Sequence, residues 1–170
     1  MLIRPLNMDV MENQVSSSDN KVLSLYKKCC KYPFGKWFFS KIFCHKAPYF
    51  ATANPRIKTL RHNYCECVIK KRRSVENHIK TVHVIAICNG LEMAMGAVAE
   101  ASIPKHLRWI PKGMTVDYTA KSGSDIRCVA EVKQEWQAGD LDVIVTAYDT
   151  SDKVVVKGMI HLWVSEKPNK

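Results

Sequence analysis

Two side chains that can take part in acid–base chemistry lie in the most apolar stretch of this sequence of 170 residues. Glu92 is a carboxylate among Leu, Met, Ala and Val, and His83 precedes it by nine positions. A carboxylate withdrawn from water must find a partner or shift its pKa, and either state suits a general base or a nucleophile. The plainer interpretations are a structural carboxylate paired across a dimer interface and a histidine that only caps a helix.

A helix predicted from Thr81 to Ala101 must position both residues. The stretch is apolar on nearly every face, which is typical of a helix buried in a core, and it would be about 30 Å long. Thr81 is the expected N-cap, and Pro104 is a stop signal just past the end. A membrane-spanning helix is rejected, because a carboxylate would lie near its centre and alternating strands follow. The polar members of the stretch are Asn89, Glu92 and Glu100.

The spacing of His83 and Glu92 places them on opposite sides of this helix. Nine residues correspond to about two and a half turns, so one chain does not easily bring the two side chains to one substrate. Two chains related by a two-fold axis can, if His83 of one subunit faces Glu92 of the other.

Positive charge is concentrated before the predicted helix. The chain carries a net charge of +10, and residues 1–80 hold 16 Lys and Arg against 5 Asp and Glu. Such a bias suggests a polyanionic partner: nucleic acid, anionic lipid or the phosphates of a nucleotide-bearing molecule. The run Lys70-Lys71-Arg72-Arg73 is weak support for nucleic acid, because one cluster at a strand end is usually solvated. Binding of phosphate groups beside the helix is a more specific role for this run.

The cysteines indicate a reducing compartment. There are seven, an odd number, and the first residues lack the apolar segment of a secretory signal. We therefore expect free thiols in the cytoplasm. Cys65-Glu66-Cys67 and Cys29-Cys30 invite a metal interpretation, but neither has a second ligand pair at finger-like spacing, and no metal is expected. Alternate positions on one buried strand explain Cys65 and Cys67 equally well.

The N-terminal part is predicted to hold a loose tail, residues 1–20, and a helical segment, residues 21–47. Apolar residues recur at helical spacing from Val22 to Tyr32, and a second apolar and basic stretch runs from Trp37 to Phe43. A basic amphipathic segment can lie on a membrane surface. Packing against the sheet or pocket of its own domain is favoured, since such patterns are common in helices of soluble proteins.

The remaining residues, 48–167, read as a single α+β domain. Strands near Ile57 and from Tyr64 to Lys71 form a predicted hairpin that turns at Arg61-His62-Asn63. After the helix, residues alternate in type over 114–121, 126–132, 141–147 and 154–164. Short connections predict that successive strands are antiparallel neighbours. The expected architecture is one long helix wrapped by a curved antiparallel sheet.

This architecture, with Asn77-x5-His83-x8-Glu92, resembles the hotdog thioesterases of the phenylacetate-pathway and thioesterase-superfamily type. In those proteins an Asn or Gln precedes a His-Gly-Gly helix start, and an Asp or Glu follows nine residues after the His. The likeness continues through Pro48-Tyr-Phe and from Trp109 to Tyr118, and it is strongest to a branch of thioesterase-like members. It covers residues 48–166.

The resemblance implies hydrolysis of an acyl thioester of CoA or of an acyl carrier protein, with CoA as part of the substrate and no separate cofactor. Glu92 would be the general base or the nucleophile. The backbone N–H groups of Val84 and Ile85 would polarise the thioester carbonyl, aided by the helix dipole. Asn77 would orient the water or the thioester oxygen, and His83 would fix the helix start or contact the leaving group.

The family also implies a homodimer, or two such dimers together, with the base from one subunit and the carbonyl-polarising groups from the other. No nucleic-acid partner is expected, and a membrane surface is not favoured. Candidate contacts for the CoA phosphates are Lys70, Lys71, Arg72, Arg73 and Lys112.

Two departures from the family pattern favour a second hypothesis. Val84 and Ile85 stand where two glycines are usual, and bulk there narrows the approach of a thioester to the backbone. The serine of some relatives falls near Pro111-Lys112. The second hypothesis is therefore a hotdog protein that binds acyl-CoA or an acyl chain without hydrolysing it. A third and weaker one is a membrane-surface protein that uses residues 22–50.

Overall fold

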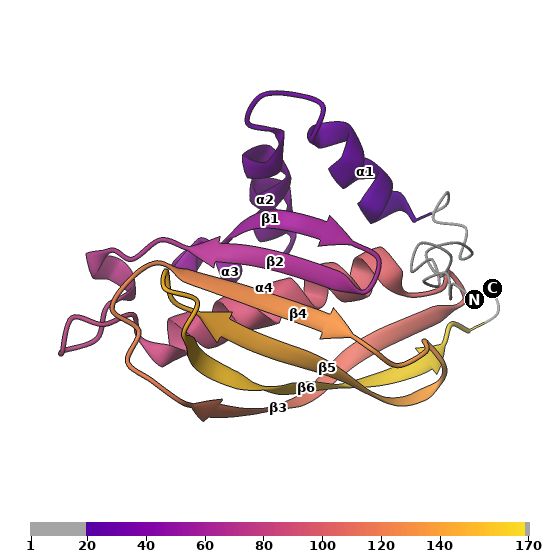
Figure 1. Ribbon diagram of the computed structural model, residues 1–170. Coiled ribbons are helices and arrows are strands. Elements are labelled where there is room, and N and C mark those ends of the chain that lie inside the picture. The colour runs from indigo at the N-terminus through magenta and orange to yellow at the C-terminus, as the bar shows by residue number, and fades with distance from the viewer. Residues whose placement is uncertain (1–19, 169–170) are drawn as a thin grey trace, which may run out of the picture.

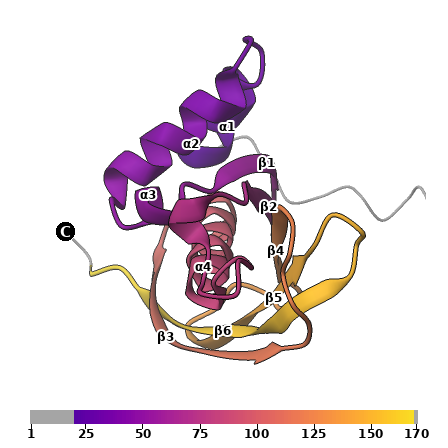
Figure 2. The same cartoon turned by 90° about the vertical axis from the view of Figure 1, so that its left-hand side faces the viewer.

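The computed structural model of the protein describes residues 20–168, so the predicted tail, except Asn20, lies outside the described residues. One helix runs through a curved antiparallel sheet, and three shorter helices pack beside it (Figures 1 and 2). The helices are α1 (Lys21–Cys29), α2 (Gly35–Lys46), α3 (Phe50–Ala53) and α4 (Val84–Ser102), with a 3-10 turn at Arg73–Val75. The strands are β1 (Arg56–Arg61), β2 (Tyr64–Ile69), β3 (Leu107–Tyr118), β4 (Ile126–Val132), β5 (Gly139–Tyr148) and β6 (Val154–Glu166).

The central helix α4 confirms the predicted core helix but begins later than expected. The N-cap is His83, not Thr81. Val82 is extended instead: it pairs with Glu76 as an isolated β-bridge and its N–H donates to the carbonyl of Ser122 at 2.8 Å. These bonds hold the chain in strand geometry up to the cap, so the helix cannot start at Thr81.

Most of α4 is enclosed, and its length and composition alone would allow it to cross a membrane. In the structure it is the core helix, and 67% of its most apolar 18-residue stretch is buried. Gly90 shows how closely the sheet approaches, because a Cβ there would lie 2.6 Å from Ile69 and 2.9 Å from Cys128. The rejection of a membrane-spanning helix therefore agrees with the packing.

The predicted hairpin is present as β1 and β2. Asn63 takes the left-handed conformation that its turn requires, with φ of 58°. Cys65 and Cys67 point from alternate positions of β2 into the core and are fully buried. The described residues contain no group of three or more His, Cys, Asp or Glu side chains placed to hold a metal.

The sheet confirms that β1 and β2, β4 and β5, and β5 and β6 are antiparallel neighbours, but it corrects the same expectation for β3 and β4. The order is β1-β2-β4-β5-β6-β3, so β3 pairs with β6 and forms one edge, while β4 pairs with β2 and β5. Residues Ser122-Gly123-Ser124-Asp125 belong to the connection between β3 and β4, which carries the chain past the start of α4 (Figure 2). Ser122 fixes it there, since its hydroxyl donates to the carbonyl of Val82 at 2.8 Å.

The N-terminal helices pack on the domain, as favoured over a membrane surface. Phe39 of α2 is buried, and the ring of Tyr26 meets it edge-on at 5.2 Å. The hydroxyl of Ser40 accepts a hydrogen bond from the N–H of Ile57 on β1. Asn20 caps α1, and its side-chain amide donates to the carbonyl of Glu100 at 2.8 Å, which ties α1 to the end of α4.

Candidate functional site

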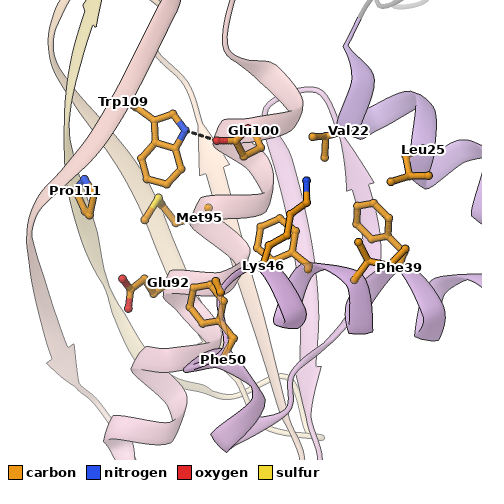
Figure 3. A pocket seen from close by; sticks show the side chains of 14 residues that line it. Val22, Leu25, Phe39, Lys46, Phe50, Glu92, Met95, Glu100, Trp109 and Pro111 are labelled. Carbon is orange, nitrogen blue, oxygen red and sulfur yellow. Dashed lines mark hydrogen bonds between the residues drawn. The ribbon is translucent and has the colours of Figure 1, made fainter.

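Glu92 lies in the wall of an apolar cavity of about 400 Å³ between the N-terminal helices, α4 and β3 (Figure 3). Its carboxylate extends from α4 in the direction of Pro111. Aliphatic, aromatic and a few charged side chains line this space: Val22, Leu25, Phe39, Ile42, Phe43, Lys46, Ala47, Phe50, Glu92, Met95, Gly96, Glu100, Trp109 and Pro111. We call it the Glu92 cavity.

The Glu92 side chain is half-buried rather than enclosed. Within residues 20–168, no group donates a hydrogen bond to its carboxylate or forms an ion pair with it. Cys88, one turn earlier, is a second conceivable nucleophile. Burial raises the pKa of the Cys88 thiol, and the charge of Glu92 raises it further. The thiol is thus kept protonated, which leaves the carboxylate as the better base.

Glu100 and Trp109 are cavity residues to which sequence reasoning assigned no role. The indole N–H of Trp109 donates to a carboxylate oxygen of Glu100 at 3.0 Å, which fixes the ring against the cavity (Figure 3). Lys46 of α2 adds an exposed ammonium group to the lining. The eight-residue spacing of Glu92 and Glu100 on one helix was a usable signal, since such positions share a face. No sequence signal places Lys46 or Trp109 there.

His83 lies on another side of α4 and caps it. Its Nδ1 atom accepts a hydrogen bond from the N–H of Ile85 at 3.1 Å. Of the two backbone N–H groups assigned to the thioester carbonyl, Ile85 is therefore engaged, whereas Val84 N–H has no partner in the described part of the chain. His83 borders hollows of about 360 and 300 Å³ that are separate from the Glu92 cavity.

Asn77 holds a turn in front of α4. Its side-chain oxygen accepts from the N–H groups of Ile79 and Thr81, both at 3.1 Å, and its amide donates to the Thr81 hydroxyl. The turn includes Lys80 at φ of 59°. Asn77, His83 and Val84 line one hollow together, and Glu92 lines a different one. A single chain thus brings together the predicted carbonyl-polarising group and Asn77 but not the predicted base.

The basic run is largely engaged with protein groups. Lys70 pairs with Asp125 at 2.6 Å, and Lys71 pairs with Glu76 at 2.7 Å. The hydrogen bond from Lys70, together with one from the Lys71 backbone, lowers the pKa of Asp125. Arg72 donates to the carbonyls of Thr52 and Ala53.

The two other candidate phosphate contacts differ in how free they are. Arg73 is exposed, and its guanidinium group has no partner among residues 20–168, although its backbone carbonyl accepts from the N–H of Glu76. Lys112 pairs with Asp140 and lies 5.6 Å from the ring centre of Trp163. None of the five candidate cations lines the Glu92 cavity.

Asn89 is a further polar residue without an assigned role. Only 5% of it is exposed, its amide donates to the carbonyl of Tyr49 at 3.3 Å, and its side-chain oxygen has no donor in the described structure. Its presence in an apolar helix was the available sequence signal. The bond to Tyr49 joins α4 to the start of α3, an element that the sequence did not predict.

Comparisons with known proteins identify the family and the fold of this chain. A family model described as "Domain of unknown function (DUF4442)" matches residues 35–164. The structural-genomics protein APC5556 is 42% identical, with a TM-score of 0.76, over 86% of this chain and 99% of that one. A search of curated proteins finds no significant match.

More distant solved structures share the fold. A thioesterase family protein from Silicibacter pomeroyi is 17% identical, with a TM-score of 0.65, over 75% of this chain and 96% of its own. The thioesterase HI1161 from Haemophilus influenzae is 7% identical, with a TM-score of 0.64, over 71% and 85%. These likenesses confirm the α+β hotdog fold expected from the sequence.

Proposed function

This chain belongs to the DUF4442 family, and from that premise we propose that it is a thioesterase that hydrolyses an acyl-CoA to a free acid and CoA. One observation carries the proposal: the carboxylate of Glu92, which has no partner among the described residues, stands on the central helix of a hotdog fold in the wall of an apolar cavity of about 400 Å³. Apolar cavities of a few hundred Å³ with few polar groups are typical of ligand sites.

In the proposed reaction Glu92 takes a proton from a water molecule as that water attacks the thioester carbonyl carbon. The carbonyl oxygen becomes an oxyanion, which the N–H of Val84 stabilises at the positive end of α4. Collapse of this intermediate breaks the carbon–sulfur bond. The CoA sulfur leaves with the proton that Glu92 had taken, and the acyl group leaves as the acid.

A second copy of the chain would complete the site. Glu92 and Val84 of one chain line different hollows, so the base and the oxyanion donor of one reaction come from two subunits. Strand β3 offers a contact for a two-fold axis, because it is a 12-residue edge strand that, within residues 20–168, pairs only with β6. Its exposed Ile110 and Tyr118 are unusual for an edge that faces water. The proposed unit is a homodimer.

The proposal for CoA uses the basic half of the chain. Arg73 is the member of the predicted run that is exposed and unengaged within the described residues, so it is the proposed phosphate contact. The proposed compartment is the cytoplasm. All seven cysteines are free thiols, as a reducing environment would keep them.

One observation favours a binding protein without catalysis. Ile85, in place of a glycine, is 54% exposed at the start of α4, where a thioester would approach, and its N–H is already engaged by His83. A protein of this kind would hold an acyl-CoA or an acyl chain in the Glu92 cavity without turnover.

Thiol release from straight-chain and aryl acyl-CoAs, measured on the wild type and on Glu92→Ala, tests the proposal. We expect the wild type to release CoA and the variant to lose about 10²–10⁴-fold in rate, with an unchanged molecular mass in light scattering. Binding of acyl-CoA without release by the wild type would replace the enzyme with the binding protein. Full activity of Glu92→Ala would remove Glu92 as the base.

A further inference from the structure

Gly96 lies midway along α4, and its free side faces the Glu92 cavity. A Cβ atom added at this position would meet only Phe43 of α2 and Trp109 of β3, each at 3.8 Å, which is an ordinary van der Waals contact. The nearest ring atoms of Phe43 and Trp109 therefore lie on either side of Gly96 and are separated from each other by no more than twice that distance. A single aliphatic chain passing between them would touch both, because carbon–carbon contact is best at about 3.5–4.0 Å.

The two glycines of α4 differ in what they do. Glycine in a helix interior costs roughly 0.5–1 kcal/mol relative to alanine. At position 90 close packing explains why the helix has a glycine, since a Cβ atom there would overlap both Ile69 and Cys128. At Gly96 no contact forbids a side chain, and its φ lies in the ordinary range. What glycine provides at Gly96 is open space in the cavity.

The cavity is about as long as an extended alkyl chain of about ten carbons. It extends along α4 at least from Glu92 to Glu100, eight residues or about 12 Å. An extended chain with bonds of about 1.5 Å advances roughly 1.25 Å per carbon, so this distance corresponds to about ten carbons. Three rings of the N-terminal helices line it in series, with Phe43 centred 6.5 Å from Phe39 and 6.2 Å from Phe50. Val22 and Leu25 of α1 complete the apolar wall.

We infer that the acyl group held in this cavity is an unbranched aliphatic chain of about ten carbons, and that Gly96 sets its length by leaving the passage between Phe43 and Trp109 open. The inference rests on the proposed function in placing the thioester next to Glu92. It adds the substrate class and a specificity-determining residue. A side chain larger than methyl at position 96 would block the passage beyond the first few carbons.

The test compares Gly96→Leu with Gly96→Ala in the full chain. Thiol release is measured with butanoyl-, decanoyl- and dodecanoyl-CoA, and equilibrium binding of decanoyl-CoA is measured by calorimetry in a Glu92→Ala background. We expect the leucine to lower decanoyl-CoA use and binding by about tenfold or more while butanoyl-CoA use stays within about threefold. The alanine variant, whose methyl group would lie 3.8 Å from both rings, should lower decanoyl-CoA use and binding less than the leucine does.

A second variant keeps the result interpretable if leucine disturbs the fold. Phe43→Ala enlarges the passage from the other side, so it should shift the preference towards dodecanoyl-CoA and restore decanoyl-CoA binding to Gly96→Leu. If decanoyl-CoA binding changes in the variants as expected but neither the wild type nor any variant releases CoA, the inference about the cavity is supported and the proposed enzyme is contradicted. Hydrolysis whose chain-length preference is the same in all the variants contradicts the inference and leaves the enzyme intact.

Discussion

His83 accepts the backbone N–H of Ile85 at its Nδ1 atom, 3.1 Å away, and so caps the helix that carries Glu92. A neutral imidazole that accepts at Nδ1 holds its proton on Nε2. The same bond engages one of the two N–H groups that the family pattern offers to a thioester carbonyl. The neighbouring N–H, that of Val84, has no partner among residues 20–168 and is the one we propose as the oxyanion donor.

Val84→Pro removes this N–H and little else. Val84 is the first residue of α4, where proline is well tolerated, and His83 already has the extended geometry that a following proline requires, with φ of −63° and ψ of 133°. We expect an unchanged melting temperature and a rate of thiol release lower by about 10²–10³-fold. Val84→Ala, which keeps the N–H, is the matched control, and equal rates for the two would exclude Val84 as the oxyanion donor.

Mixed dimers test whether the site is shared between subunits. Val84→Pro and Glu92→Ala should each be inactive alone, but a dimer with one chain of each kind has one intact site. After co-refolding, random pairing predicts recovery of about a quarter of wild-type activity. No recovery, with hybrid dimers shown by mass spectrometry, would place the base and the oxyanion donor in the same chain.

Replacing His83 separates capping from chemistry. His83→Ala should lower the free energy of unfolding by about 1 kcal/mol in urea titrations, whereas His83→Asn should restore the cap. We expect His83→Asn to retain thioester hydrolysis within a few-fold, since the structure gives His83 the role of holding the helix start. A stable but inactive His83→Asn protein would instead require the imidazole in the reaction.

The two glycines of α4 should respond oppositely to alanine. Gly96→Ala relieves the backbone cost and should stabilise the protein by about 0.5–1 kcal/mol. Gly90→Ala forces a methyl group against Ile69 and Cys128 and should destabilise it by about 1–3 kcal/mol. Chemical unfolding of both variants measures the difference, and stabilisation by Gly90→Ala would show that the helix and the sheet are further apart than described.

Asp125→Asn should lower stability only above acidic pH. The pKa of Asp125 is lowered by its bonds to Lys70 and to the Lys71 backbone, so its stabilising effect is full above the ordinary carboxyl pKa of about 4 and is lost as the pH falls through the lower folded value. We expect a loss of about 0.5–1 kcal/mol at neutral pH for this partly exposed pair. The loss should fade in unfolding curves at pH of about 2–3.

A control for this pair is Asp152→Asn. The Asp152 side chain is 80% exposed and pairs with Arg127, so its removal should change stability less than the removal of Asp125. A deficit for Asp125→Asn that persists unchanged at acidic pH would assign its effect to the hydrogen bonds and not to the charge.

Much of this fold follows from local pattern. The apolar run that became α4 and the alternation that became β4, β5 and β6 are each readable within a short window. The position of β3 in the sheet cannot be read in this way, because the connection between β3 and β4 is compatible either with a hairpin or with a crossover to another position in the sheet. What decides it is the anchoring of Ser122 to Val82, residues 40 positions apart. Local pattern also misplaced the cap at Thr81, because a bridge to Glu76 extends the chain there.

The candidate site was predictable only in part. Glu92, His83 and Asn77 stand out by type and spacing. The structure places His83 and Asn77 at one hollow and Glu92 at another, in agreement with the opposite directions expected for His83 and Glu92. The cavity depends on how residues 22–50 pack, which helical spacing alone does not fix. For that reason the sequence alone did not predict that Gly96 and Trp109 line the cavity.

The pairing of β3 with β6 sets the order in which the chain can fold. During synthesis α4 and β3 leave the ribosome well before β6, so β3 lacks its partner in the described sheet until β6 has been made. Until then, α4 can already pack on β2 and β4, which make most of its contacts with the sheet, whereas the long strand β3 has no hydrogen-bonded partner among the described strands. The nascent protein is thus exposed to aggregation through the unpaired edges of β3 until β6 has been made.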